Sequence, residues 1–274
     1  MVQREFSKTR DRLKIRYEVR GAGDPVALIM GFSASSRGWG EEFLRPMEER
    51  FKLLVIDNRG TGESDQPDQP WTISDMAADV ASVLDHAKVD RAHIFGISMG
   101  GMIAQEFVLA YPERVRGLML GCTNCGAKHS APAQPEAVAA LMLDPAMPPA
   151  EQVKRALTAA CGKAFVASPR FQEMIAQILA EAGNYPITPM HTYQRQMQAI
   201  MEFETYNRLP AIKAPTLIIH GDDDAIVPYQ NGEILNSRIA GSRLFLIRRA
   251  GHMFFRESPD ETVLATAECF SAAK

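Results

Sequence analysis

Short apolar runs alternate with longer stretches of helical periodicity along most of the chain. Residues 26–30 and 53–56 are continuously apolar, as is typical of strands that are covered on both faces of a parallel sheet. Residues 72–89 and 99–111 instead carry apolar side chains at helical spacing, and Pro112 ends the second stretch. This alternation predicts successive βαβ units.

The pattern predicts an α/β fold built on a mostly parallel, eight-stranded, doubly wound sheet. The first two strands alternate more strongly between polar and apolar residues, and no helical stretch separates them, so we expect an antiparallel edge. The eight predicted strands read REFSKTR, LKIRYEVR, PVALIMGF, KLLVIDN, AHIFGIS, RGLMLGC, PTLIIHG and RLFLIRRA.

The alternation stops between residues 124 and 213, where only helical segments are predicted. We therefore expect two parts: a core made of residues 1–123 and 214–274, and an all-helical cap, 124–213, over one end of the sheet. The alternative is that these helices merely pad the sheet. Ser168-Pro169 and Thr188-Pro189 are predicted helix starts, and Gly183 a stop. The predicted segments are 135–144, 149–165, 169–182 and 189–209.

Composition and charge exclude several classes of protein. The chain is 46% hydrophobic and 23% charged with a net charge of −3, so no basic patch indicates nucleic-acid binding or a polybasic membrane anchor. The N-terminus lacks the apolar region of a signal peptide, and no apolar stretch approaches the roughly 20 residues that span a bilayer. These features predict a cytoplasmic location without nucleic-acid or membrane partners, and they leave the oligomeric state open.

Two of the four cysteines form a C-x-x-C pair, Cys122 and Cys125. A redox or zinc site is one interpretation. Zinc normally requires four ligands, however, and no second closely spaced pair is present. We favour ordinary buried thiols, reduced in the cytoplasm, and predict no metal site.

Ser98 lies between two glycines in GISMG, where an apolar strand ends and a helix begins. Glycines at positions 96 and 100 permit a sharp turn that exposes the serine hydroxyl. The following helix N-terminus favours negative charge developing beside it. Ser98 is therefore a candidate nucleophile, although it could also be a small residue in a glycine-rich turn.

A nucleophilic serine needs a base, and His252 is the best placed of the six histidines. It follows the last strand, at the sheet edge where α/β proteins gather reactive groups. His86 and His93 fall inside predicted elements, which indicates structural roles, and His220 ends a strand and could stabilise a turn. His129 and His191 in the predicted cap remain candidate substrate contacts.

Three consecutive carboxylates follow a strand in LIIHGDDDAIVP, residues 217–228. One of them could orient an imidazole, or all three could be solvated loop acids. The order serine, aspartate, histidine, each after a separate strand, favours the first interpretation.

Five segments in order resemble the α/β-hydrolase fold superfamily, of the capped serine esterase and lactonase type. They are MGFSASSRGWG, DNRGTGESD, GISMGG, HGDDDAIVP and GHMFFRESP, and with their strands they cover nearly all of the chain outside the insertion. The resemblance implies Ser98 as nucleophile, His252 as base, Asp224 as acid, and the backbone N–H groups of Phe32 and Met99 as oxyanion donors. Met30 stands where the family usually has histidine, which leaves the backbone donor in place.

The resemblance further implies a serine hydrolase that cleaves a small to medium carboxylic ester or lactone through an acyl-enzyme. Such chemistry needs no cofactor, and its partner is the small-molecule substrate. Methionine and aromatic residues in the predicted cap suggest an apolar pocket over Ser98. Two alternatives remain: a cofactor-free perhydrolase or haloperoxidase, and a ligand-sensing protein without enzymatic activity.

Overall fold

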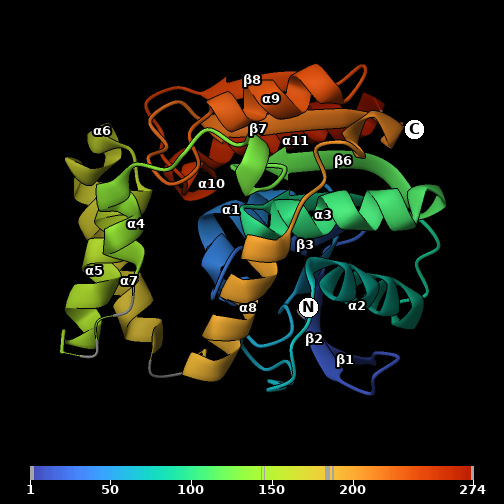
Figure 1. The fold of residues 1–274 in the computed structure, drawn as a ribbon, viewed down its shortest axis with the longest axis horizontal. Coiled ribbons are helices and arrows are strands. Elements are labelled where there is room, and N and C mark those ends of the chain that lie inside the picture. Colours follow the sequence, from blue (N-terminus) through green and yellow to red (C-terminus); the bar gives the residue numbers. More distant parts are fainter. Residues whose placement is uncertain (1–2, 143, 145, 183–185, 187, 273–274) are drawn as a thin grey trace.

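An eight-stranded sheet forms the centre of the molecule (Figure 1). The computed structural model describes residues 3–142, 144, 146–182, 186 and 188–272. Strand β2 pairs antiparallel with β1 and β4, and the other neighbours pair in parallel. The predicted fold class and the predicted antiparallel edge are both confirmed. The sheet order is β1 (Gln3–Lys8), β2 (Lys14–Arg20), β4 (Lys52–Ile56), β3 (Pro25–Ile29), β5 (Ala92–Ile97), β6 (Val115–Gly121), β7 (Thr216–Gly221) and β8 (Arg243–Ile247).

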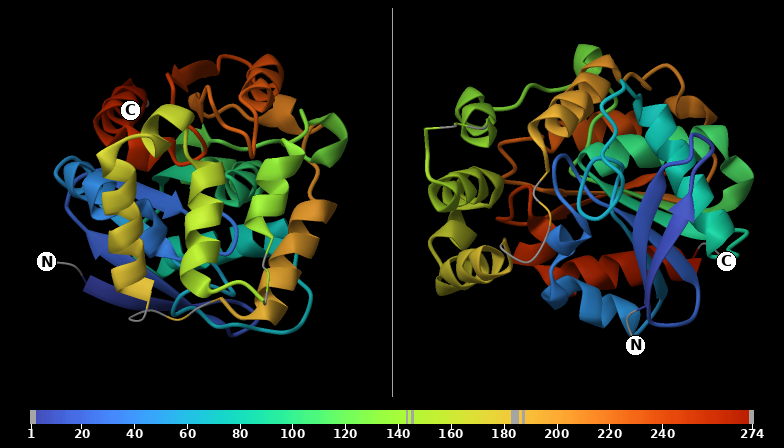
Figure 2. Two further views of the ribbon diagram at one scale, coloured as in Figure 1. Left: turned by 90° about the vertical axis from the view of Figure 1, so that its left-hand side faces the viewer. Right: turned by 90° about the horizontal axis from the view of Figure 1, so that it is seen from below.

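Helices cover both faces of this sheet (Figures 1 and 2). Successive side chains of β5 point to opposite faces: Ile94 packs in the cluster that includes α2, α3 and α9, and Phe95 in the one that includes α1, α10 and α11. Among the described residues, no helix combines the length and apolarity needed to cross a bilayer. The helices are α1 (Glu41–Glu48), α2 (Ile73–His86), α3 (Met99–Ala110), α9 (Gln230–Arg238), α10 (Phe254–Glu257) and α11 (Pro259–Ala272).

The start of α2 shows how local sequence fixes an element. The Thr72 hydroxyl accepts a hydrogen bond from the Asp75 N–H, and the Asp75 carboxylate accepts one from the Thr72 N–H. This capping box satisfies two backbone donors that the first helical turn leaves without partners. Thr72 is therefore the N-cap of α2.

The chain between β6 and β7 folds into five further α-helices in its described part. Helices α4 to α7 stand beyond one end of the sheet, and α8 returns along the core (Figure 2). The predicted helix 149–165 is broken at Gly162, where a side chain would overlap the Arg249 carbonyl. The predicted helix 189–209 ends earlier, where Glu204 forms a bridge with Gly126. The helices are α4 (Pro135–Leu141), α5 (Pro149–Ala160), α6 (Lys163–Val166), α7 (Pro169–Ala182) and α8 (Met190–Glu202).

Two predicted helix ends in this segment have different outcomes. The predicted stop at Gly183 lies outside the described residues. Thr188 does not cap α8, because Pro189 occupies the N-cap position. The Thr188 hydroxyl instead donates to the carbonyl of Ser33, 3.0 Å away in the loop after β3.

The packing predicts that stability depends strongly on Phe107 of α3. This side chain is fully buried, so Phe107→Ala should lower the free energy of unfolding by about 3–5 kcal/mol. Leu264→Ala is a matched control, because Leu264 is 62% exposed and its truncation should change stability by less than about 0.5 kcal/mol. Urea denaturation of both variants measures the difference, and equal midpoints would contradict this account of the core.

Candidate active site

Ser98 occupies a sharp turn between β5 and α3. Its backbone angles, φ 55° and ψ −122°, lie in a region that residues with side chains rarely adopt. A side chain at position 96 would overlap the Gly100 carbonyl, and one at position 100 would overlap the Ile29 carbonyl. Glycine is therefore required at both flanking positions, and the serine side chain remains partly exposed.

The main chain of Ser98 is held in place by the end of β6. Its N–H donates to the carbonyl of Gly121 at 2.9 Å, and its carbonyl accepts from the Thr123 hydroxyl at 2.7 Å. Its carbonyl also accepts from the N–H of Gly101 at 2.9 Å. These bonds fix the turn without using the Ser98 hydroxyl.

His252 and Asp224 form a hydrogen-bonded pair in the loops after β8 and β7. Nδ1 of His252 lies 2.8 Å from Oδ2 of Asp224. The other carboxylate oxygen accepts the N–H groups of Ile226 and Val227, each at 2.9 Å, and the Asp224 side chain is fully buried. Burial alone lowers the pKa of His252, but the charges and hydrogen bonds of Asp224 and Cys122 together outweigh it and hold that pKa well above 6.5.

The two neighbouring carboxylates have other partners. Asp222 accepts from the N–H of Arg249 and forms an ion pair of 3.2 Å with Arg248. Asp223 accepts from the N–H of Lys163, 2.8 Å away in the segment between β6 and β7. Of the three consecutive acids, Asp224 is the one that the structure brings to His252.

Cys122 is a neighbour of this pair that the sequence analysis missed. Its sulfur, a ring nitrogen of His252 and a carboxylate oxygen of Asp224 lie within 4.8 Å of one another. Burial raises the pKa of the thiol. Zinc accepts all three ligand types, but His252 and Asp224 already bond each other, so an acid–base pair flanked by a thiol explains the group better.

The C-x-x-C pair does not act as a unit in this structure. Cys122 packs in the hydrophobic cluster on the α1 and α11 face of the sheet, and Cys125 in the cluster on the α2 and α3 face. Both cysteines are free thiols. The structure therefore favours two separate buried thiols over a dithiol site.

The two predicted oxyanion donors lie on adjoining segments. Met99 is the first residue of α3, so its N–H has no partner within the helix. Among the hydrogen bonds of the described residues, the N–H of Phe32 has no protein acceptor either. Gly31 approaches Ser98 so closely that a Cβ there would lie 3.1 Å from the serine Cβ.

Comparison with known proteins places this geometry in a family. A family model for the alpha/beta hydrolase fold matches residues 24–259. The chain belongs to the α/β-hydrolase family. Membership and the relatives identify it as a hydrolase.

Three relatives show the range of reactions near this hydrolase. A protein of Azorhizobium caulinodans, provisionally named carbamate hydrolase RutD, is 30% identical over 89% of this chain and 90% of its own. A Mycobacterium tuberculosis protein, provisionally named non-heme bromoperoxidase BpoC, is 26% identical over 96% and 99%. The structure of Est816, described as an N-acyl homoserine lactone degrading enzyme, superposes with a TM-score of 0.81 at 29% identity, covering 96% and 99%.

The other five histidines of this α/β-hydrolase have local partners or burial that explain them. His86 bonds the Tyr17 hydroxyl, His93 stacks on Phe270, His129 stacks on Tyr206, His191 bonds the Gln66 carbonyl, and His220 is fully buried at the end of β7. Burial lowers the pKa of His93 and of His220 to about 4.

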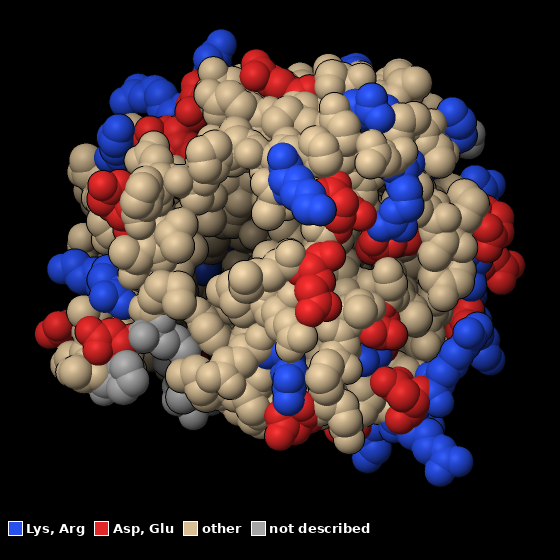
Figure 3. Space-filling view, in the orientation of Figure 1, with Lys and Arg blue, Asp and Glu red and all other residues tan. Residues whose placement is uncertain are grey.

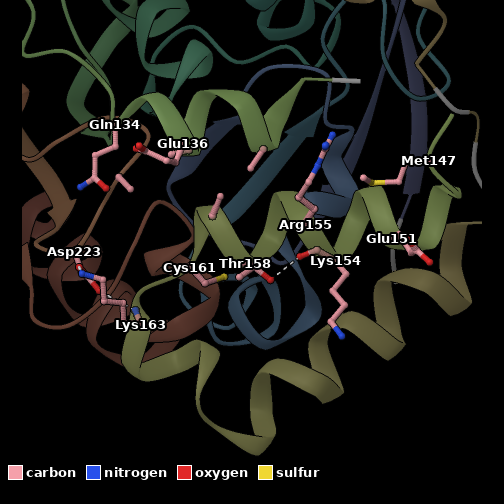
Figure 4. Close-up of a pocket in the computed structure, with 14 residues that line it drawn as sticks. Gln134, Glu136, Met147, Glu151, Lys154, Arg155, Thr158, Cys161, Lys163 and Asp223 are labelled. Carbon is pink, nitrogen blue, oxygen red and sulfur yellow. Dashed lines mark hydrogen bonds and ion pairs between the residues drawn. The ribbon is translucent and has the colours of Figure 1, made fainter. Parts of the chain in front are cut away.

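A cavity of about 750 Å³ lies between α4 and α5 and reaches Asp223 and Lys163 (Figure 4). Neither Ser98 nor His252 lines it, and its ionisable side chains carry both signs of charge. Separately, the surface is hollowed between the region of α4–α7 and that of α8 (Figure 3). Of the methionines expected in an apolar pocket, Met201 is 73% exposed, and Met174 packs among the insertion helices.

We predict that His252 titrates above pH 6.5, while His93 and His220 stay neutral down to about pH 5, because their pKa values lie near 4. A base must be neutral, so activity that depends on His252 should rise with pH through this raised pKa. NMR titration of the ring signals measures all three residues. Asp224→Asn should lower the pKa of His252, and an unchanged value would show that this carboxylate does not hold the proton there.

Proposed function

We propose that this hydrolase cleaves a small to medium carboxylic ester or lactone through a covalent acyl-enzyme at Ser98. The observation that carries the proposal is the 2.8 Å bond between His252 and the fully buried carboxylate of Asp224. That pair lies beside the loop after β6 to which the Ser98 turn is bonded. A buried carboxylate that orients an imidazole near a partly exposed serine is the arrangement that nucleophilic acyl transfer requires.

In the proposed mechanism His252 accepts the Ser98 proton at Nε2 while Oγ attacks the acyl carbon. Asp224 keeps the other ring nitrogen protonated and stabilises the imidazolium. The N–H groups of Phe32 and Met99 stabilise the tetrahedral oxyanion. His252 then gives its proton to the leaving alkoxide. Water, deprotonated by the same histidine, attacks the acyl-enzyme, and His252 returns that proton to Ser98 Oγ as the acyl–oxygen bond breaks, which releases the acid and free Ser98.

The names of the relatives support an acyl carbonyl as the reacting group. The name of Est816 includes a lactone, and the name of RutD includes a carbamate. Both groups present a carbonyl carbon bonded to a leaving heteroatom. The same nucleophile, base and oxyanion donors serve either group. We favour an ester or lactone because a carboxylic acyl carbon is the more reactive of the two.

The helical insertion, residues 124–213, is proposed to cap the site and to limit substrate size. Support comes from the Ala160 carbonyl, which accepts from the N–H groups of His252 at 2.6 Å and Met253 at 3.2 Å. The insertion therefore contacts the loop that carries the proposed base. It supplies no proton in this mechanism.

A second candidate is perhydrolysis, in which hydrogen peroxide replaces water at the acyl-enzyme and gives a peracid. The likeness to BpoC along 96% of the chain favours this reaction as the alternative. Peroxide-dependent bromination of monochlorodimedone in the presence of acetate tests it. A ligand-sensing protein without enzymatic activity would neither turn over esters nor react covalently with a fluorophosphonate.

We predict that Ser98→Ala lowers kcat for p-nitrophenyl butyrate by at least about 10³-fold, because the nucleophile is lost. The smaller side chain fits the turn, so circular dichroism and the thermal midpoint should match the wild type. Wild-type protein should take up one fluorophosphonate per chain, on Ser98. Near-normal turnover by the alanine variant would overturn the proposed nucleophile.

We predict that Asp224→Asn lowers kcat by an amount on the order of 10⁴-fold, because the histidine loses its orienting carboxylate. Asp222→Asn and Asp223→Asn are matched controls on the same loop, and they should lose far less because their partners lie elsewhere. Steady-state kinetics of the three variants measures the contrast. A folded control variant as impaired as Asp224→Asn would move the assignment of the acid.

A further inference from the structure

The loop after β3 is held by side chains that no catalytic motif contains. Ser33 follows the proposed oxyanion residue Phe32 and has φ 58°, a left-handed conformation that is strained for a serine. Gly31 precedes Phe32 and adds backbone freedom. A loop with a glycine on one side of the donor and a strained residue on the other needs outside support to keep one shape.

Gln196 of α8 supplies that support with both ends of its amide. Its Oε1 accepts the Ser33 N–H at 2.8 Å, and its Nε2 donates to the Arg59 carbonyl at 3.0 Å. The side chain is fully buried. The amide thus bridges the loop after β3 to the turn after β4, at a site where unpaired polar groups would be costly.

Neighbouring side chains hold the same two loops. The Thr188 hydroxyl donates to the Ser33 carbonyl at 3.0 Å, and Thr192 donates to the Gly60 carbonyl at 3.0 Å. The ring of Tyr193 lies 4.6 Å from that of Phe32, centroid to centroid. Gln196 is the only one of these four that bonds the peptide linking Phe32 to Ser33.

We infer that Gln196 is a positioning residue for the oxyanion site. By fixing the Phe32–Ser33 peptide, it fixes the direction of the adjoining Phe32 N–H toward the substrate oxygen. It touches no reacting atom. The inference rests on the proposed acyl transfer at Ser98. It adds that stabilisation of the transition state depends on one residue of the insertion, Gln196.

Gln196→Met tests the inference, because methionine has a similar size and cannot form either hydrogen bond. We expect kcat to fall about 10- to 100-fold. This loss is no greater than the roughly 10²–10³-fold loss that follows complete removal of an oxyanion donor. KM should change by less than about 3-fold. Affinity for a trifluoromethyl ketone, which forms a tetrahedral oxyanion on the serine, should fall by the same factor as kcat/KM.

Gln105→Met is the matched control. Gln105 is also fully buried, donates to the carbonyls of Gly101 and Asn124, and accepts from the Thr205 hydroxyl. It makes no bond to the loop after β3, so it should share any loss of stability without the selective loss of ketone affinity. Should Gln196→Met fail to fold, Thr188→Val removes the second bond to Ser33 and should lower ketone affinity in the same direction.

The outcomes separate the two levels of the argument. Wild-type protein that neither hydrolyses esters nor takes up the fluorophosphonate would overturn the proposed function. Active wild-type protein whose Gln196→Met variant keeps its ketone affinity, or loses it no more than Gln105→Met, would overturn the positioning role alone. If Gln196→Met does not fold, Thr188→Val is measured instead, and unchanged ketone affinity in that variant would also overturn the positioning role.

Discussion

The close backbone approach at the Ser98 turn is the constraint on which the site depends. Without side chains at positions 96 and 100, the first turn of α3 lies directly against the end of β5 and the carbonyl of Ile29 at the end of β3. This contact brings the start of α3 beside the loop that carries Phe32, and among the described residues the N–H of Met99 there has no acceptor. Two donors from separate segments can then face one oxygen atom.

Backbone hydrogen bonds continue the parallel pairing of the sheet for one residue beyond the ends of β5, β6 and β7. Ser98 donates to Gly121, Cys122 donates to Ile219, and Asp222 donates to Ile247, at 2.9, 2.9 and 3.1 Å. Each bond extends a parallel ladder by one step. The loops after β5, β6 and β7 therefore leave the sheet in fixed register, and this register explains why the Cys122 thiol lies beside the His252–Asp224 pair.

Sequence patterns predicted the fold and the turn at Ser98, because each depends on local periodicity or on strand order. Ser98 was found from its glycines, whereas strand order left three candidate acids after β7, and only the resemblance to the α/β-hydrolase superfamily singled out Asp224. Cys122 was placed after the correct strand, but which face its side chain takes depends on a backbone turn with φ 38°. The sequence did not single out Gln196, because its partner Ser33 lies 163 residues earlier. No local pattern distinguishes a helical glutamine with such a partner from any other glutamine in a helix.

The insertion bonds several of the loops that the proposed chemistry uses. Helix α8 bonds the loop after β3 through Gln196, and the junction of α5 and α6 bonds the histidine loop. At that junction Glu257 accepts the N–H groups of Gly162 at 2.9 Å and Gly251 at 3.0 Å. Burial raises the pKa of Glu257 to about 7, and protonation of this carboxylate weakens its ability to accept these two bonds.

In the proposed mechanism, this arrangement couples the insertion to catalysis in two different ways. On that proposal, a change at α8 alters how charge on the substrate oxygen is stabilised, whereas a change at the α5–α6 junction alters the position of the proposed base, His252. Since Gly251 and Gly162 approach too closely for any side chain, the junction leaves little room for adjustment.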